Sequence, residues 1–250
     1  MKYHELTPEQ KLHIYEQGWV IIPKVVPLEM VETARNAINS TIENYLDSIQ
    51  THAHTLKTDE RLTNMLMKTE AFSLIESALG EGKVVPSNNV QCALRFPGHD
   101  LKSLNNLSPH IDSFHPSKDG EAGRITPFIA IAGFFLNDID QDNAGNFVVW
   151  PGTHREFAKY FQQYGADPEL KRGIPPVDLP KPIQIKAKAG DMIFAHYQLA
   201  HTAAANISRD IRYAVYIRIH HADRPKDSLD VLTDIWKYWY GMPPLQKASE

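Results

Sequence analysis

Residues 211–220 read IRYAVYIRIH, a stretch in which the two sets of alternate positions differ in character. Tyr213, Val215 and Ile217 make up one set, whereas Arg212 belongs to the other. Successive side chains of a strand point to opposite faces of the sheet, so this alternation predicts a β-strand with two unlike faces. One face can direct Arg212 into the protein, where a guanidinium group needs an anionic partner.

Similar stretches occur from residue 84 onward and predict about eight strands in all. Turn-forming residues separate them, as at 189–191 and 206–210. Eight antiparallel strands commonly close as a double-sheet jelly roll of the cupin type, whose mouth gathers side chains from several strands. The clearest predicted strands besides 211–220 are 90–96, 126–136, 147–150, 183–185, 192–194 and 198–204.

Helical patterns come before these strands. Thr7-Pro8-Glu9-Gln10 predicts a helix start with a capping box, and Gly18 is expected to end that helix. Residues 19–22 then predict a short strand. Apolar residues at helical spacing predict further helices at 28–49, across 62–79 and at 154–164.

Helices followed by strands indicate an α+β fold, with a double-stranded β-helix (jelly-roll, cupin-like) core and N-terminal and flanking helices. No stretch resembles an interdomain linker, and 250 residues suffice for one sizeable domain. We therefore expect residues 1–250 to form a single domain. Its parts are a helical N-terminal region at about 1–83, the core at about 84–221 and a C-terminal aromatic segment at 222–250.

Composition restricts the classes of function. The formal charge of −4 provides no basic field for a nucleic acid, and an acidic surface argues against binding to a membrane. The longest apolar run, 127–136, is too short to span a bilayer, and the first residues show no apolar signal region. Because the single cysteine, Cys92, excludes an internal disulfide, we expect a reducing cytoplasm.

The motif His110-Ile111-Asp112 predicts two metal ligands, because residues i and i+2 of a strand point to the same face. His201 or His196 can supply a third ligand, and His201 is preferred because small side chains follow it. Two imidazoles and one carboxylate on one face of a metal leave the opposite face open, as in non-haem Fe(II) oxygenases. The alternatives are a surface ion pair for the motif, and packed or exposed roles for His196 and for His220-His221.

Arg212 follows His201 along the chain and can bind a dicarboxylate co-substrate through two parallel N–H···O bonds. The alternative is that Arg209, Arg212 and Arg218 are all surface charges on an edge strand. Together with the three candidate ligands, Arg212 suggests an iron- and 2-oxoglutarate-dependent oxygenase.

Several segments carry a family resemblance. Residues 6–10 and 18–23 read LTPEQ and GWVIIP, residues 146–154 read NFVVWPGTH, and residues 190–196 read GDMIFAH. With the His-x-Asp motif, the distal histidine and the arginine in this order, the sequence resembles the phytanoyl-CoA dioxygenase family of Fe(II)/2-oxoglutarate-dependent oxygenases. The resemblance extends over residues 7–221.

The resemblance implies that His110, Asp112 and His201 bind Fe(II), and that Arg212 pairs with the distal carboxylate of 2-oxoglutarate. Arg95 corresponds to a basic residue that family members often have near the co-substrate. Such enzymes use O2 and release succinate and CO2, so we expect hydroxylation of a small-molecule metabolite. Asp112 also retains the carboxylate that related halogenases lack, which favours hydroxylation or a related oxidation.

One position departs from the family. Members often have a serine two positions after the distal histidine, where it helps to hold 2-oxoglutarate, but this chain has Ala203. Either Ser208 or Arg95 compensates, or the co-substrate binds less tightly.

The substrate is less well marked. The absence of a basic run leaves a CoA thioester no better supported than a free metabolite, and we expect a monomer or a homodimer. The aromatic segment 236–240 can cover the pocket, form a dimer contact or pack outside the barrel. Four candidates for the barrel mouth, each with ordinary packing or loop surface as its alternative, are Gln91, Phe114, His115 and Trp150.

Two other functions are compatible with the same residues. A cupin-like protein can bind Zn(II) or Ni(II) through the same three side chains without turning over 2-oxoglutarate, because imidazole suits several metals. In a structural or interaction protein the histidines would be coincidental.

Overall fold

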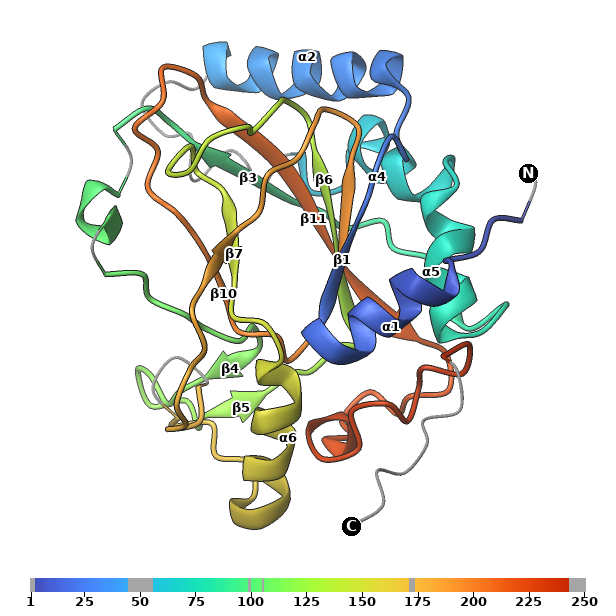
Figure 1. Cartoon of the computed structure of the whole chain (residues 1–250), viewed down its shortest axis with the longest axis vertical. Helices are drawn as coiled ribbons and strands as arrows, with labels where there is room; N and C mark the ends of the chain where they lie inside the picture. Colours follow the sequence, from blue (N-terminus) through green and yellow to red (C-terminus); the bar gives the residue numbers. More distant parts are fainter. Residues whose placement is uncertain (1–2, 45–55, 99, 105, 171–173, 243–250) are drawn as a thin grey trace.

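The computed structural model describes residues 3–44, 56–98, 100–104, 106–170 and 174–242 (Figure 1). Its largest element is a six-stranded sheet in the order β1-β9-β6-β11-β2, with β3 also paired to β11. Every pairing in this sheet is antiparallel. The strands are β1 (Trp19–Ile22), β2 (Val84–Val85), β3 (Gln91–Arg95), β6 (Ala130–Phe135), β9 (Met192–His196) and β11 (Arg212–His221).

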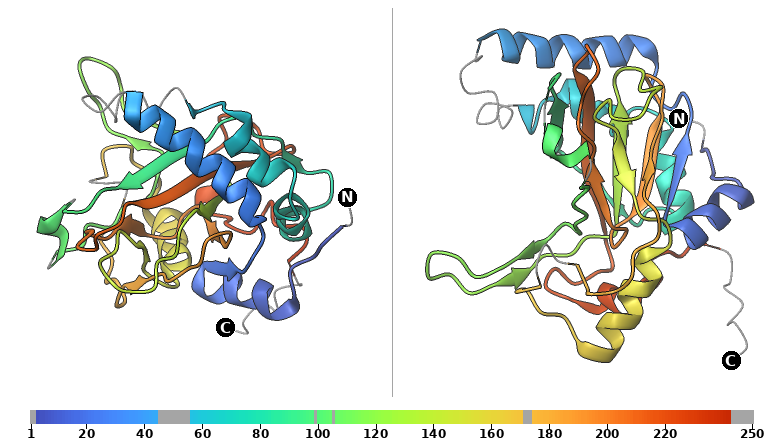
Figure 2. Two further views of the ribbon diagram at one scale, coloured as in Figure 1. Left: turned by 90° about the horizontal axis from the view of Figure 1, so that it is seen from above. Right: turned by 60° about the vertical axis from the view of Figure 1, so that its left-hand side comes forward.

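A smaller sheet of three antiparallel strands, in the order β10-β7-β8, packs against the first. Its strands are β7 (Phe147–Val149), β8 (Ile183–Gln184) and β10 (His201–Ala203). A separate hairpin joins β4 (Phe114–His115) to β5 (Arg124–Ile125), and its loop extends away from the body of the molecule (Figure 2). The predicted α+β fold with a jelly-roll core and flanking helices is confirmed.

Five α-helices accompany the sheets in the described residues: α1 (Pro8–Gln17), α2 (Leu28–Asn44), α4 (Glu60–Met67), α5 (Ala71–Leu79) and α6 (Thr153–Tyr164). The predicted start of α1 is confirmed, because Thr7 and Gln10 form a reciprocal capping box and Gly18 ends the helix in the left-handed conformation. Residues 45–49, the end of the helix predicted over 28–49, lie outside the described residues. No helix in the described ranges has the length and apolar character that a membrane crossing needs.

Three predicted boundaries were wrong. Of the strand expected over 198–204, only His201–Ala203 forms β10. The helix expected across 62–79 is divided into α4 and α5, because the Thr69 hydroxyl donates to the carbonyl of Met65 and accepts the N–H of Ala71. Such side-chain bonds compete with the helical pattern. The strand expected over 126–136 is shorter, since β6 begins at Ala130; Pro127 has no N–H to donate to a ladder.

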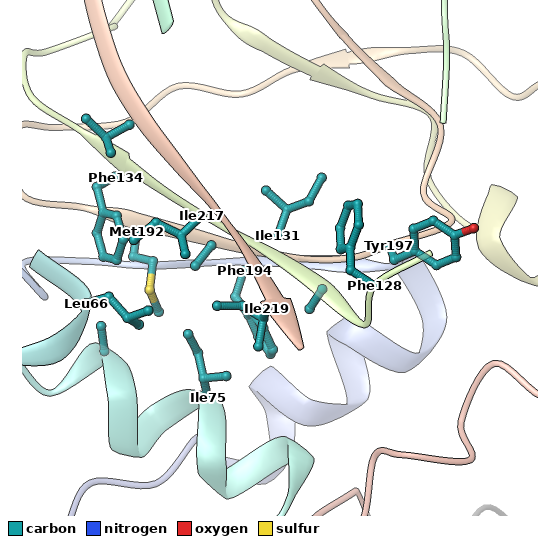
Figure 3. Packing of buried hydrophobic residues seen from close by; sticks show 14 of the residues in the cluster. Leu66, Ile75, Phe128, Ile131, Phe134, Met192, Phe194, Tyr197, Ile217 and Ile219 are labelled. Atoms are coloured by element: carbon teal, nitrogen blue, oxygen red, sulfur yellow. The ribbon is translucent and has the colours of Figure 1, made fainter. Parts of the chain in front are cut away.

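The faces of β11 separate two apolar clusters. On the outer face Ile217 and Ile219 pack with residues of α4 and α5, among them Leu66 and Ile75 (Figure 3). On the inner face Ala214 belongs to a cluster between the two sheets, with Phe135, Phe147 and Ile193. The alternation in residues 211–220 therefore gives β11 two unlike faces, as predicted, and its inner face points into the barrel.

The C-terminal aromatic segment packs outside the barrel, which was one of the three possibilities for it. The rings of Trp236 and Trp239 lie 5.2 and 5.4 Å from the ring of His196 on β9. His196 Nε2 donates to the carbonyl of Ile235, and Nδ1 accepts the N–H of Gln198. This neutral ring is completely enclosed, and burial lowers the pKa of His196 to about 4.

We expect the free energy of unfolding to fall as the pH is lowered from about 6.5 toward about 4. Unfolded His196 binds a proton near its ordinary pKa of 6.5, whereas the folded protein resists protonation down to about 4. Acid therefore favours the unfolded state, by roughly 2 kcal/mol for His196 between about pH 6.5 and pH 5. Urea denaturation at the two pH values measures the difference.

The variant His196→Gln should lose part of this pH dependence, whereas His13→Gln, at a partly exposed position on α1, should retain it. Equal free energies of unfolding for the wild type at both pH values would contradict the expectation.

Candidate metal centre

The structure brings His110, Asp112 and His201 together from distant parts of the chain. Their ligand atoms all lie within 4.8 Å of one another. Asp112 Oδ1 is 3.6 Å from His110 Nε2 and 3.9 Å from His201 Nε2. Metal–ligand bonds to such groups are about 2.0–2.2 Å long, so small side-chain rotations suffice to close the three donors around one ion.

A backbone bridge holds the two histidines side by side. His110 and His201 form an isolated antiparallel bridge in which each N–H donates to the other's carbonyl, at 3.0 and 3.1 Å. Side chains of directly opposed residues lie on the same face, and the two ring centroids are 4.5 Å apart. Asp112, two positions after His110, completes the cluster. It lies in a turn, so the expectation that a strand places both side chains on one face was wrong, and the loop after the bridge positions the carboxylate.

The tautomer of His201 leaves its outer nitrogen available. Nδ1 donates to the carbonyl of Leu199 at 2.9 Å, so in the neutral ring Nε2 carries the lone pair that faces Asp112. Phe147 stacks on the same ring, with centroids 5.2 Å apart and planes 17° from parallel. A hydrogen bond of this kind fixes the orientation of a ligating histidine.

The three side chains of the cluster differ in their exposure to solvent. The side chain of His201 is 8% exposed, that of Asp112 20% and that of His110 41%. One side of the site therefore faces solvent and can receive further ligands. The donor set of two imidazoles and one carboxylate is that of non-haem Fe(II) sites, so the residues present fit an iron ion.

Arg218 is a site residue that the sequence pattern did not single out. Its Nε and Nη2 donate to Asp112 Oδ2 at 3.1 and 2.8 Å, and Nη2 also donates to Gln91 Oε1 at 3.3 Å. Burial would raise the pKa of Asp112, but His201, Arg218 and His110 together outweigh burial and lower it. Arg218 therefore occupies one carboxylate oxygen and leaves Oδ1 directed at the histidines. Arg218 lies an even number of residues after Arg212, and this spacing in the sequence could have placed it on the same face of the strand.

Arg212 is a buried cation on the inner face of β11, only 2% exposed. Its Nε donates to the carbonyl of Gly145 at 2.7 Å and its Nη1 to that of Ala93 at 3.1 Å. Burial lowers the pKa of Arg212, but an arginine stays charged in proteins. Among the described residues no carboxylate pairs with it, and Arg95 lies opposite it in the strand register.

The other candidate residues have varied surroundings. Gln91 touches Arg218, and Arg95 is half-buried beside Arg212. Phe114 stacks on Phe161 of α6, exposed His115 contacts Thr126 Oγ1, and Trp150 is buried in the apolar core. Of the alternative ligands, His196 uses both ring nitrogens elsewhere, and His221 Nε2 donates to the carbonyl of Leu79.

Comparison with known proteins yields one family and a set of related folds. The profile of the phytanoyl-CoA dioxygenase family matches residues 14–214. No match is found among curated protein sequences.

Three solved structures show the shared fold. AviO1 from Streptomyces viridochromogenes Tue57 is 14% identical with a TM-score of 0.58, over 88% of this chain and 97% of that one. The epimerase SnoN in complex with Fe3+, α-ketoglutarate and nogalamycin RO is 16% identical with a TM-score of 0.54, covering 89% and 88%. HygX from Streptomyces hygroscopicus with nickel, 2-oxoglutarate and hygromycin B bound is 15% identical with a TM-score of 0.51, covering 88% and 90%.

We expect Arg218→Gln to weaken Fe(II) binding roughly 10- to 100-fold, the usual effect of losing a group that orients a metal ligand. Without the guanidinium, Asp112 can rotate and its charge loses a fixed partner. Anaerobic Fe(II) titration of the metal-free protein measures the affinity. Arg155→Gln is the matched control. Arg155 lies over the ring of Tyr15 as Arg218 lies over the ring of Phe128, but Arg155 is on α6. Unchanged affinity in Arg218→Gln would rule out the positioning role.

Proposed function

The chain belongs to the phytanoyl-CoA dioxygenase family, and we propose that His110, Asp112 and His201 hold the iron with which it hydroxylates a small molecule. The protein is a non-haem Fe(II)- and 2-oxoglutarate-dependent dioxygenase that uses O2. The observation that carries the proposal is the convergence of two imidazoles and one carboxylate beside a barrel strand with a buried arginine that pairs with no carboxylate of the described residues.

Each protein group has a distinct task in this proposal. When bound, iron with 2-oxoglutarate and O2 supplies the oxidising power, and the co-substrate leaves as succinate and CO2. His201, fixed through Leu199, presents Nε2 to the metal, and His110 presents its ring from the exposed side. Arg218 holds Asp112 in the ligating orientation.

Arg212 is proposed to bind the distal carboxylate of 2-oxoglutarate. A buried guanidinium that meets only carbonyl oxygens is poorly compensated, and a carboxylate supplies the missing charge. Arginine also matches a carboxylate geometrically, through two parallel N–H donors. Arg95, opposite Arg212 on β3, is proposed to add to the positive field there.

The substrate is proposed to enter from the end of β11 beyond Arg218. Arg218 lies over the ring of Phe128, which is 6.4 Å from the ring of His220. A pocket of about 370 Å³ opens at His220, a volume in the range of small-ligand sites. Its lining mixes apolar and charged residues, which suits a small metabolite that carries both apolar and polar groups; the lining includes Val85, Ile125, Thr126, His220, Arg224 and Asp227.

Small molecules are also the substrates suggested by similar folds, since HygX and SnoN were solved with hygromycin B and nogalamycin RO. Gln91 and His115 are the predicted mouth residues that lie toward this pocket, through Arg218 and Thr126 respectively. Phe114 and Trp150 are proposed with less direct support, because their rings pack against protein.

The proposal includes a single catalytic domain in a reducing cytoplasm. β1 from the N-terminal region is a strand of the main sheet, and the C-terminal aromatic segment packs on β9. Cys92 is a free, half-buried cysteine.

We expect anaerobic addition of Fe(II) and 2-oxoglutarate to the metal-free protein to produce the weak visible charge-transfer band of a chelated keto acid. His110→Ala and Asp112→Ala should abolish the band and succinate release while unfolding at nearly the wild-type temperature, because both side chains are partly exposed. His4→Ala, at an exposed histidine paired with Glu70, is the control and should behave as wild type.

The outcome separates two functions. Bound metal without a band would favour the cupin-like metal-binding protein without 2-oxoglutarate turnover. Full activity in His110→Ala or Asp112→Ala would refute the site itself.

A further inference from the structure

The hydroxyl group of Tyr216 is buried and has no hydrogen-bond partner among the described residues. Buried polar atoms in native proteins are nearly always paired, so an orphan hydroxyl calls for an explanation such as an absent ligand. Burial raises the pKa of Tyr216 more than Arg212 and Arg95 lower it, so the hydroxyl keeps its proton and can donate.

The hydroxyl lies on the face of β11 that carries the proposed site. Tyr216 is four residues after Arg212 and two before Arg218, and side chains at even spacing share a face. Its ring centroid is 5.5 Å from that of Phe147, which in turn stacks on the metal-side histidine His201. Along β11, Tyr216 thus lies between the buried Arg212 and Arg218, the residue that holds Asp112.

A glycine on the neighbouring strand fixes the position of the tyrosine ring. Gly133 pairs with Tyr216 in the register of β6 and β11. A Cβ at Gly133 would come within 2.5 and 2.6 Å of two atoms of the ring, so only glycine leaves room for the ring to lie down on the sheet. The ring of Tyr216 therefore lies over Gly133 on the inner face of the sheet.

The two positions considered from the sequence for this role, Ala203 and Ser208, offer no free hydroxyl donor. Ala203, which faces Phe147 across the smaller sheet, has no polar group. The Ser208 hydroxyl donates to Asn206 Oδ1 at 2.6 Å. Of the three guanidinium nitrogens of Arg212, Nε and Nη1 bond to carbonyls, and Nη2 has no partner among the described residues.

We propose that Tyr216 is the second anchor of the co-substrate, its O–H donating to the distal carboxylate that Arg212 binds. The inference rests on the proposed function, because it assumes that 2-oxoglutarate is the anion beside Arg212. One carboxylate oxygen then receives the charged donor and the other receives the phenolic donor, which gives Arg212 an anionic partner and pairs the orphan hydroxyl of Tyr216. The hydroxyl of Tyr216 thus supplies the hydrogen bond to 2-oxoglutarate that a serine at position 203 would supply and Ala203 cannot.

Tyr216→Phe tests the anchor, because it removes only the hydroxyl and keeps the ring on Gly133. Anaerobic titration with 2-oxoglutarate in the presence of Fe(II), followed by the charge-transfer band, should show affinity weakened roughly 10- to 100-fold, as expected for a lost hydrogen bond to a charged group. Binding of 2-oxobutyrate, a keto acid without the distal carboxylate, should be equal in the variant and the wild type. Fe(II) affinity should also be unchanged.

The matched control is Tyr213→Phe, which removes a hydroxyl from the opposite face of the same strand, where it donates to Asn39 Oδ1. This variant should bind 2-oxoglutarate as the wild type does. In the double variant Tyr216→Phe with Ala203→Ser, a hydroxyl returned to the facing strand should recover part of the lost affinity.

Each result has a defined meaning. Undiminished 2-oxoglutarate affinity in Tyr216→Phe, with a wild-type protein that binds 2-oxoglutarate, would overturn the anchor but leave the oxygenase intact. Equal weakening for 2-oxobutyrate, or a loss of Fe(II) affinity, would also overturn it by showing a general structural role. A wild type that binds Fe(II) but no 2-oxoglutarate would instead refute the proposed function, and the anchor with it.

Discussion

The backbone bridge between His110 and His201 is the constraint on which the centre depends. Two reciprocal N–H···O bonds join residues that lie far apart in sequence, and they set the two imidazoles on one face at a centroid distance of 4.5 Å. Backbone geometry is stiffer than side-chain geometry, so the spacing of the donors is decided before any metal binds. The turn that follows His110 then brings in the carboxylate of Asp112.

The inner face of β11 carries three further polar side chains of the proposed site. Arg212, Tyr216 and Arg218 lie on one face of one strand, and the opposite face is apolar and packs against the helices. A slip of one residue in the register would exchange these faces, exposing the apolar set and burying charges against α4 and α5. The hydrophobic core therefore fixes the pairing register of β11, and this register keeps Arg212, Tyr216 and Arg218 on the inner face.

Because the charged groups of the site are partly or fully buried, each needs a partner of opposite charge. Asp112 is compensated by Arg218 and the histidines, whereas the part of the chain that the structure describes offers Arg212 only main-chain carbonyls. An uncompensated buried charge is tolerated at a site where a ligand completes it. Gly133 adds to the same arrangement, because the absence of a side chain there lets the ring of Tyr216 lie against the sheet.

The sequence alone determined the class of fold and predicted the candidate donors. Periodicity identified the strands, the capping residues identified α1, and the order of His110, Asp112, His201 and Arg212 suggested the chemistry, because all of these are local patterns. Only the tertiary structure decided which polar groups meet. The grip of Arg218 on Asp112, the enclosure of His196 and the orphan hydroxyl of Tyr216 arise from pairing between distant strands. Register and packing create such contacts, and no short stretch of sequence encodes them.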